Sequence, residues 1–357
     1  MRFQGKSLRE MVAYFDSISI KPYDPVFGGT GELASIADIL EQNRDMEPFV
    51  IQSSATETPF LGRVNHEPLQ FVHFSDVHAV LELWNRMVTY VNHYGDYIAF
   101  ALHTGDYCGD NQQQCRDCYG EGIPCTKPIF NCVGNHDTIT GPQWDKTEKI
   151  EAWKRLFHST ENWNVNFLDC PCSMSYYRDF PDSNIRLIVL DQYYDLQPQL
   201  IWLRELLADA QKKDLWVITA MHEPTAEIVD APNVTFHTLT KFPPLRETPF
   251  ESVLKDFIAE GGNFICNFCG HEHHDLFGYT AGGVLNVAVE CATDWAGWCD
   301  GKRVRGTRTY DCFNVVSIDV DLGILKLVRI GNNADYYLRQ KHVLCYDYSK
   351  RMVVFNG

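Results

Sequence analysis

Short apolar runs that alternate with helix-like segments set the pattern of the chain from residue 69 onward. The first run, residues 69–76 (LQFVHFSD), ends in a polar turn. The next segment repeats apolar residues at Val80, Trp84, Met87 and Val91, which is the spacing of one helix face. Further strand-like runs occupy residues 97–106, 128–137, 185–191, 215–223 and 263–275, and helix-like segments occupy residues 145–157, 198–210 and 251–260. This alternation predicts an α/β domain with largely parallel strands.

The last third of the chain is rich in strand-like runs. Residues 311–320 (DCFNVVSIDV) and 324–330 (ILKLVRI) flank DLG, a short turn that predicts a hairpin. A parallel half followed by a meandering half predicts two sheets packed together. We expect a main domain over residues 69–330, an N-terminal extension over residues 1–68 that packs on it, and a C-terminal extension over residues 331–357.

The composition of the 357-residue chain limits the classes of function. Hydrophobic residues make up 45%, which is enough for a core and argues against a disordered chain. The formal net charge of −16 disfavours non-specific binding to nucleic acid or anionic membranes, because their phosphate groups would be repelled. The sequence shows no secretory leader and no apolar span of about 18 residues. We therefore expect a cytoplasmic protein whose 13 cysteines are thiols or metal ligands.

Metal-ligand residue types close five of the strand-like runs. The densest group is residues 269–275 (CGHEHHD), where three histidines and two acids follow one apolar run. Such imidazoles repel one another when protonated, whereas a metal cation needs them neutral; taken alone, the stretch fits a solvated turn equally well. The other four runs end in Asp76-Val77-His78, Gly105-Asp106, Asn135-His136-Asp137 and His222-Glu223. Because sites form at the carboxyl ends of strands in an open α/β sheet, five such groups together predict a metal centre.

The order of these motifs, D-x-H, G-D, G-N-H-D, H and G-H-x-H, resembles the calcineurin-like metallophosphoesterase superfamily over residues 69–330. Residues 190–207 (LDQYYDLQPQLIWLRELL) also resemble the segment that precedes the fourth motif of that family. The resemblance implies a four-layer α/β/β/α sandwich of two packed, mostly mixed sheets. It also implies that the protein is a metal-dependent phosphoesterase, a hydrolase acting on ester bonds.

The resemblance further implies a dinuclear metal centre. One ion would be held by Asp76, His78 and His273, the other by Asn135, His222 and His271, and Asp106 would bridge them. A shared carboxylate is needed because two cations about 4 Å apart repel each other. Nitrogen and oxygen ligands suit divalent or trivalent transition metals, namely Mn, Fe or Zn. A hydroxide that bridges the ions would attack the phosphoric ester.

Several residues near these ligands are assigned roles by the same resemblance. His136 stands where the family stabilises the transition state or protonates the leaving oxygen, and Asp137 would orient it. In the last motif, His271 and His273 are expected to point to the same side of a turn and serve different ions. Glu272 would face away from the ions, tuning charge at the rim of the site, and Asp275 would also line that rim.

Two further segments carry candidate residues. The loop of residues 294–310 offers Trp295 and Trp298 to stack on a base or sugar, and Arg303, Arg305 and Arg308 to contact a phosphate oxygen. An ordinary solvated loop fits the same residues. Cys115, Cys118 and Cys125 have partial zinc-knuckle spacing, which fits an extra metal, a redox pair or plain thiols.

Three functions remain in competition at this point. The leading one is hydrolysis of a phosphodiester or phosphomonoester, with a small or nucleotide-like phosphorylated substrate. A catalytically silent scaffold that keeps the fold is disfavoured because every ligand position is filled. A metallo-nuclease is disfavoured by the acidic charge. The sequence specifies neither the substrate nor the oligomeric state.

Overall fold

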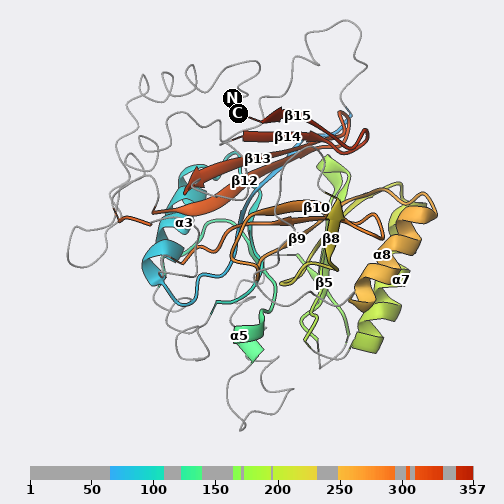
Figure 1. Cartoon of the computed structure of the whole chain (residues 1–357), viewed down its shortest axis with the longest axis horizontal. Helices are drawn as coiled ribbons and strands as arrows, with labels where there is room; N and C mark the ends of the chain where they lie inside the picture. The colour runs from blue at the N-terminus through green and yellow to red at the C-terminus, as the bar shows by residue number, and fades with distance from the viewer. Residues whose placement is uncertain are drawn as a thin grey trace, which may run out of the picture.

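Two mixed β-sheets form the centre of the protein in the computed structural model (Figure 1). The structure describes residues 65–107, 122–138, 164–169, 173–193, 196–230, 248–293, 303–305, 310–332 and 343–356. The predicted helix over residues 145–157, and all but the last four residues of the N-terminal extension, lie outside these ranges.

The first sheet has seven strands among the described residues. Its order is β15 (Met352–Asn356), β14 (Val343–Asp347), β13 (Ile324–Gly331), β12 (Cys312–Asp319), β1 (Leu69–Phe74), β2 (Phe100–His103) and β3 (Ile129–Asn131). β1, β2 and β3 pair in parallel, whereas the strands from β12 to β15 pair antiparallel. β12 and β13 form the predicted hairpin. β14 and β15, which belong to the predicted C-terminal extension, continue this sheet beyond β13.

The second sheet has eight described strands and a parallel centre. Its order is β4 (Asn166–Phe167), β5 (Tyr176–Phe180), β6 (Ile185–Val189), β7 (Trp216–Ala220), β9 (Phe264–Cys269), β11 (Leu285–Ala288), β10 (Leu276–Thr280) and β8 (Ile228–Asp230). β6, β7, β9 and β11 are parallel, and antiparallel strands lie at both edges. The prediction of an α/β fold with two mixed sheets is therefore confirmed.

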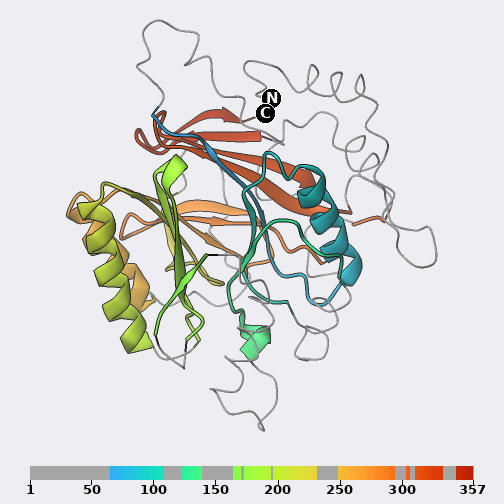
Figure 2. The ribbon, with the colours of Figure 1, turned by 180° about the vertical axis from the view of Figure 1, so that it is seen from behind.

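Helices cover the two outer faces of the paired sheets (Figures 1 and 2). α3 (Leu81–His93) lies on the seven-stranded sheet, and α7 (Leu196–Lys212) and α8 (Pro249–Ala259) lie side by side on the other sheet. Thr248 caps α8 by accepting a hydrogen bond from the N–H of Glu251, and Pro249 takes the first helical turn. α5 (Asn135–Thr138) is a single turn directly after β3, and a 3₁₀ turn, Pro181–Ser183, joins β5 to β6.

Three apolar layers hold these four layers together. Val72 of β1 packs with the inner face of α3, while its neighbour Phe71 stacks on Phe100 between the two sheets at 4.6 Å between ring centroids. Val217 of β7 packs under α7 and α8. Alternate residues of one strand thus enter different layers, which explains why the central strands read as continuous apolar runs. No helix among the described residues is long and apolar enough to cross a membrane.

Candidate metal centre

The predicted ligands lie in five loops that follow parallel strands of both sheets. Asp76 and His78 follow β1, Asp106 follows β2, Asn135 begins α5 after β3, His222 follows β7, and His271 and His273 follow β9. Hydrogen bonds between these loops connect the two sheets and also, within the eight-stranded sheet, the ends of β7 and β9. The N–H of His271 donates to Asp76 Oδ2 at 3.1 Å, and the N–H of Gly270 donates to the carbonyl of His222 at 2.8 Å.

One group of ligand atoms gathers around Asp76. The side chains of Asp76, His78, Asp106 and His273 are buried, and one ligand atom of each lies within 4.8 Å of the others. His273 Nε2 is 3.3 Å from both Asp76 Oδ1 and His78 Nε2. These three side chains are the set predicted for one ion, and the structure brings them together.

A second group gathers around His222. Its Nε2 lies 3.1 Å from Asn135 Oδ1 and 3.3 Å from His271 Nδ1, and that Nδ1 lies 3.0 Å from the same Asn135 oxygen. Asp106 connects the two groups, because its Oδ2 is 3.3 Å from His222 Nε2 while the carboxylate also belongs to the first group. His271 and His273 therefore enter different groups from one turn.

The donor atoms fit metal ions. Asp76 Oδ1 is buried and accepts no hydrogen bond of good geometry from the described residues, although His273 Nε2 lies 3.3 Å away. Two imidazole nitrogens 3.3 Å apart occur in each group. Two nitrogen ligands about 2.0–2.1 Å from one tetrahedral ion lie about 3.3 Å apart. The Nδ1 of His222 meets the carbonyl of Thr104 at 2.6 Å, which leaves Nε2 to face the centre.

The electrostatics of the centre favour a bound cation. Burial lowers the pKa of both His78 and His271 to about 4, so these imidazoles are neutral, as metal binding requires. Burial also opposes ionisation of Asp76, yet the facing imidazoles, His273 first, hold the pKa of that carboxyl well below its usual range. Burial would lower the pKa of His222, but Asp106 outweighs it and raises the pKa to about 10. Without a metal, the two carboxylates therefore draw a proton onto His222.

Left-handed backbone conformations aim the ligands inward. Five of the predicted ligands have positive φ although none is glycine: Asp76 (53°), His78 (46°), Asp106 (58°), His271 (65°) and His273 (57°). Such conformations cost about 1–3 kcal/mol each and cluster at functional sites. A side chain at Gly134 would overlap the carboxylate and backbone nitrogen of Asp106, which explains why this motif needs glycine there.

His136 and Asp137 lie beside the ligands with different exposures. The His136 side chain is 22% exposed, with Nε2 3.9 Å from Asp106 Oδ2, and its ring contacts that of His78 edge-on. Asp137 is fully buried. Its carboxylate accepts hydrogen bonds from the backbone N–H of Asp106, Tyr107 and Gly134, at 3.0, 2.9 and 2.8 Å. Asp137 therefore ties the second and third motifs together, a contact that the sequence reasoning did not foresee.

Comparison with known protein families places this centre in context. The profile of the family described as calcineurin-like phosphoesterase matches residues 69–275, more than half of the chain. The chain belongs to the calcineurin-like phosphoesterase family. The family predicted from the order of the motifs is thereby confirmed, and so is the prediction of a phosphoesterase enzyme. The match ends at Asp275, just after the last pair of predicted ligands.

One of three similar solved structures has a TM-score above 0.5 and shows the same fold, at low sequence identity. A dimetal phosphatase from Danio rerio is 12% identical, with a TM-score of 0.54 over 79% of this chain and 100% of that one. A purple acid phosphatase from yellow lupin (Lupinus luteus) seeds is 12% identical, with a TM-score of 0.45 over 83% of this chain and 54% of that one. GAP50, the anchor in the inner membrane complex of Plasmodium, is 12% identical with a TM-score of 0.47, covering 77% and 89% of the two chains. A comparison with curated protein sequences found no match.

The arginines proposed to contact a phosphate have other partners in this phosphoesterase. Arg303 has a fully buried side chain that donates to the carbonyls of Tyr310, Cys291 and Ala292. Arg305 is half exposed and pairs with Glu82 at 2.8 Å. Both arginines therefore serve local structure, because their guanidinium groups are engaged by the protein. Trp295, Trp298 and Arg308 lie outside the described residues.

Two acids expected at the rim are buried instead. Glu272 is 1% exposed and Asp275 is 8% exposed. Asp275 Oδ1 pairs with the buried guanidinium of Arg329 and also accepts the N–H of Glu290 at 2.9 Å. The expectation for Asp275 was wrong because a buried arginine on β13, fifty-four positions away, supplies its countercharge.

The described cysteines include two in the core. Cys266 and Cys269 are fully buried in two different apolar clusters, because they lie on opposite faces of β9. Cys125 is half-buried, and burial raises the pKa of its thiol to about 11, which disfavours the thiolate. Cys115 and Cys118 lie outside the described residues, so the proposed extra metal or redox pair stays a prediction.

Sequence reasoning missed a tyrosine and a carboxylate beside the second group of ligands. The hydroxyl of Tyr193 donates to Glu223 Oε1 at 2.6 Å, and the Tyr193 ring lies 6.3 Å from that of His222. The signal was present, since Tyr193 belongs to the segment LDQYYD that was compared with the family and Glu223 directly follows a predicted ligand.

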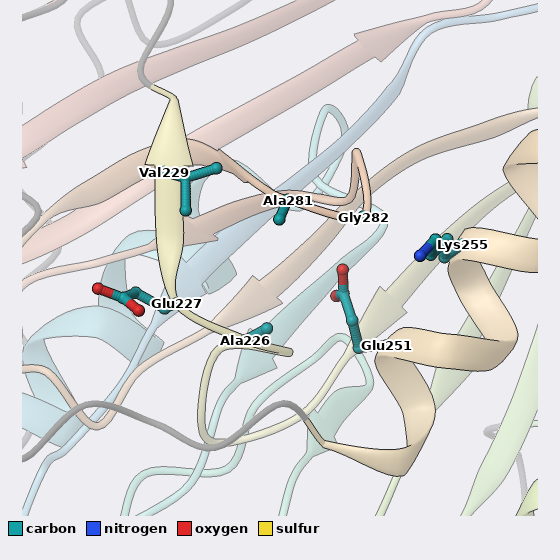
Figure 3. A pocket seen from close by; sticks show the side chains of 7 residues that line it. All are labelled: Ala226, Glu227, Val229, Glu251, Lys255, Ala281 and Gly282. Carbon is teal, nitrogen blue, oxygen red and sulfur yellow. The ribbon is translucent and has the colours of Figure 1, made fainter.

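A cavity of about 260 Å³ lies apart from these ligands (Figure 3). It opens between β8, α8 and the turn at Gly282, and Glu251 points into it from α8. The cavity is lined by Ala226, Glu227, Val229, Glu251, Lys255, Ala281 and Gly282. None of the predicted ligands lines it, so this cavity is separate from the Asp/His cluster.

Proposed function

We propose that this protein hydrolyses a phosphoric ester at a dinuclear metal centre. Asp76, His78 and His273 would hold one ion, Asn135, His222 and His271 the other, and Asp106 would contact both. One observation carries the proposal. Each of the two groups contains a pair of imidazole nitrogens 3.3 Å apart, and the carboxylate of Asp106 reaches both groups. Two buried nitrogen pairs around one carboxylate are difficult to stabilise without cations.

The chemistry divides between the ions and the protein. When bound, the ions, which we propose to be Mn, Fe or Zn, would supply a deprotonated water as nucleophile and neutralise charge on the phosphoryl oxygens. His136 is the partly exposed imidazole beside Asp106, so it is placed to donate a proton to the leaving oxygen or a hydrogen bond to the transition state. Asp137 accepts hydrogen bonds from the N–H groups of Asp106 and Gly134 and so holds these two loops together.

The substrate we propose is a small phosphorylated molecule, for example a nucleotide-like diester or monoester. The net charge of −16 supports this choice over a nucleic-acid backbone, because a long polyanion would be repelled by the whole protein. The cytoplasmic location expected from the sequence is part of the same proposal.

The test of this proposal is the substitution Asp106→Asn. Metal content is measured after loading with Mn²⁺, and turnover is measured with bis-p-nitrophenyl phosphate and p-nitrophenyl phosphate. We expect the variant to bind less metal at both positions and to lose at least about a hundredfold in turnover. The matched control is Asp96→Asn, an exposed carboxylate, which should keep metal and activity. Normal metal content and turnover in a folded Asp106→Asn protein would reject the dinuclear assignment.

A further inference from the structure

Glu223 and Tyr193 form a hydrogen-bonded pair beside the predicted ligand His222. Glu223 directly follows His222 after β7, and Tyr193 lies in the loop after β6. The Tyr193 hydroxyl donates to Glu223 Oε1 at 2.6 Å, and both side chains are half-buried. The two residues follow neighbouring parallel strands, β6 and β7, so their pairing places the Glu223 carboxylate at the carboxyl edge of the eight-stranded sheet, next to His222.

The pair is held by its own hydrogen bonds to the backbone. The N–H of Glu223 donates to Gln192 Oε1 at 2.9 Å, and the N–H of Tyr193 donates to Asp191 Oδ1 at 3.2 Å. Asp191 is itself buried and accepts the N–H of Met174 at 3.0 Å. Burial, reinforced by Glu223, raises the pKa of Tyr193 well above its usual range, so the phenol remains a donor. The Glu223 carboxylate is therefore fixed in one position.

The charge of this carboxylate reaches the metal centre without being one of the seven predicted ligands. The ring contact between Tyr193 and His222 places the pair on the side of the second group of ligands. A fixed negative charge at that point acts on any anion that binds there.

We propose that Glu223, positioned by Tyr193, is a specificity-determining residue that favours phosphodiesters over phosphomonoesters. The proposal rests on the proposed phosphoester hydrolysis. A phosphodiester carries one negative charge, whereas a phosphomonoester carries close to two above pH 7, because its second pKa is about 6. The second charge meets additional repulsion from Glu223 in a region shielded from water. In the proposed centre Asp76 and Asp106 would bind the ions, so their charge would be neutralised and would not supply this discrimination.

The first experiment compares three esters with matched leaving groups at pH 8. p-Nitrophenyl phosphate is a dianion, p-nitrophenyl methylphosphonate is a monoanion of nearly the same size, and bis-p-nitrophenyl phosphate is a monoanionic diester. We expect Glu223→Gln to raise kcat/KM for the dianion about tenfold relative to both monoanions. If Glu223→Gln changes kcat/KM equally for p-nitrophenyl phosphate and for p-nitrophenyl methylphosphonate, position 223 discriminates by size or shape and not by charge. This result would overturn the proposal.

The role of Tyr193 is tested by a double-mutant cycle. Tyr193→Phe removes the hydrogen bond but keeps the charge, so the selectivity should shift in the same direction as in Glu223→Gln and by less. The double variant should shift no further than Glu223→Gln alone, because the phenol acts only through the carboxylate. Additive shifts would show that Tyr193 has an independent effect on the substrate. Glu227→Gln, which removes an exposed charge four positions along the same segment, should leave the ratio unchanged.

A binding measurement separates this proposal from the proposed hydrolysis. The Mn²⁺-loaded protein is titrated at pH 8 with inorganic phosphate, a dianion, and with dimethyl phosphate, a monoanion. Glu223→Gln should bind phosphate about tenfold more tightly and dimethyl phosphate as the wild type does. If this binding shift occurs without turnover of any ester, the hydrolytic function is wrong and the charge discrimination stands. If esters are hydrolysed but Glu223→Gln changes neither the kcat/KM ratio nor the affinity ratio between dianion and monoanion, the role of Glu223 is refuted and the hydrolytic function stands. Absence of both binding and turnover would refute both.

Discussion

Asp137→Asn is the substitution for which the structure gives the most specific expectation. The carboxylate is fully buried and has two acceptor oxygens. Oδ2 accepts the N–H groups of Asp106 and Gly134, and Oδ1 accepts that of Tyr107. An amide of the same shape keeps only one acceptor oxygen. Whichever way it turns, its NH₂ group faces at least one backbone N–H, so a donor meets a donor in a site that water does not reach.

The expected cost follows from the number of hydrogen bonds lost. A hydrogen bond to a charged acceptor contributes about 1.5–3 kcal/mol, and a buried donor left without a partner costs about 1–3 kcal/mol. The more favourable orientation keeps the bonds from Asp106 and Gly134 and loses the bond from Tyr107, while the two retained bonds lose their charged acceptor. We therefore expect the free energy of unfolding to fall by about 3 kcal/mol. Mn²⁺ affinity should fall with it, because Asp106 is then less firmly placed.

Urea denaturation of the chelator-treated protein measures the first quantity, and calorimetric titration with Mn²⁺ measures the second. Chelation matters because bound metal would stabilise the folded state and hide part of the loss. The control is Asp182→Asn, an exposed carboxylate whose substitution should change the free energy of unfolding by less than about 0.5 kcal/mol. An Asp137→Asn protein that unfolds within about 0.5 kcal/mol of the wild type would refute the assignment of Asp137 as the connection between the loops.

Three further predictions concern the metal centre. His136→Ala should keep both metals, by elemental analysis, and lose most of kcat; an unchanged kcat would reduce His136 to a structural residue. His271→Ala and His273→Ala should each lose metal and activity. Because the two histidines enter different groups of ligands, each variant should lose the ion of a different group. The pKa of His78 and of His271 is about 4, below the ordinary 6.5, so between pH 6.5 and 4 the unfolded chain binds the protons first. The metal-free protein should therefore lose stability as pH falls through that window, by up to about 1.4 kcal/mol per pH unit for each imidazole, and melts with and without chelator at pH 7.5 and 5.5 should diverge.

His222 does not oppose this pH dependence within the same window. Its pKa is raised to about 10, chiefly because Asp106 outweighs burial, so its stabilising contribution is complete below pH 6.5 and is lost only as pH rises toward 10. Between pH 6.5 and 4 it is protonated in both states of the metal-free chain. The slope expected there belongs to the imidazoles with lowered pKa.

The positions of the ligands could be predicted from the sequence because they depend on topology. Parallel strands bring their carboxyl ends to one edge of a sheet, so the residues after β1, β2 and β3 lie close together, as do those after β7 and β9. The packing of the two sheets then brings these two sets of residues together. The helices α3, α7 and α8 were predictable for a similar reason, since their apolar spacing is regular over three turns or more.

Features that depend on charged partners on other strands or helices were not predictable. β5 (YYRDF) carries two charged residues and does not read as a strand, yet Asp179 pairs with the fully buried Arg186 of β6 directly across the sheet. Arg186 also reaches Asp209 on α7 at 2.8 Å. The burial of Asp275 has the same origin in Arg329. A polar residue looks solvated in a sequence when its countercharge lies on another strand.

The backbone conformation of the ligand loops also depends on contacts that the local sequence does not show. Asp76, Asp106 and His273 have left-handed backbone conformations that their residue types disfavour. The local sequence does not predict these conformations. Hydrogen bonds between loops hold two of these conformations: Asp76 donates its N–H to the carbonyl of Gly105, and Asp106 donates its N–H to Asp137. The loops therefore stabilise one another across both sheets, and the cost of several strained residues is offset by contacts that only the complete fold provides. Hydrogen bonds of the protein itself thus help to fix the backbone of these ligands.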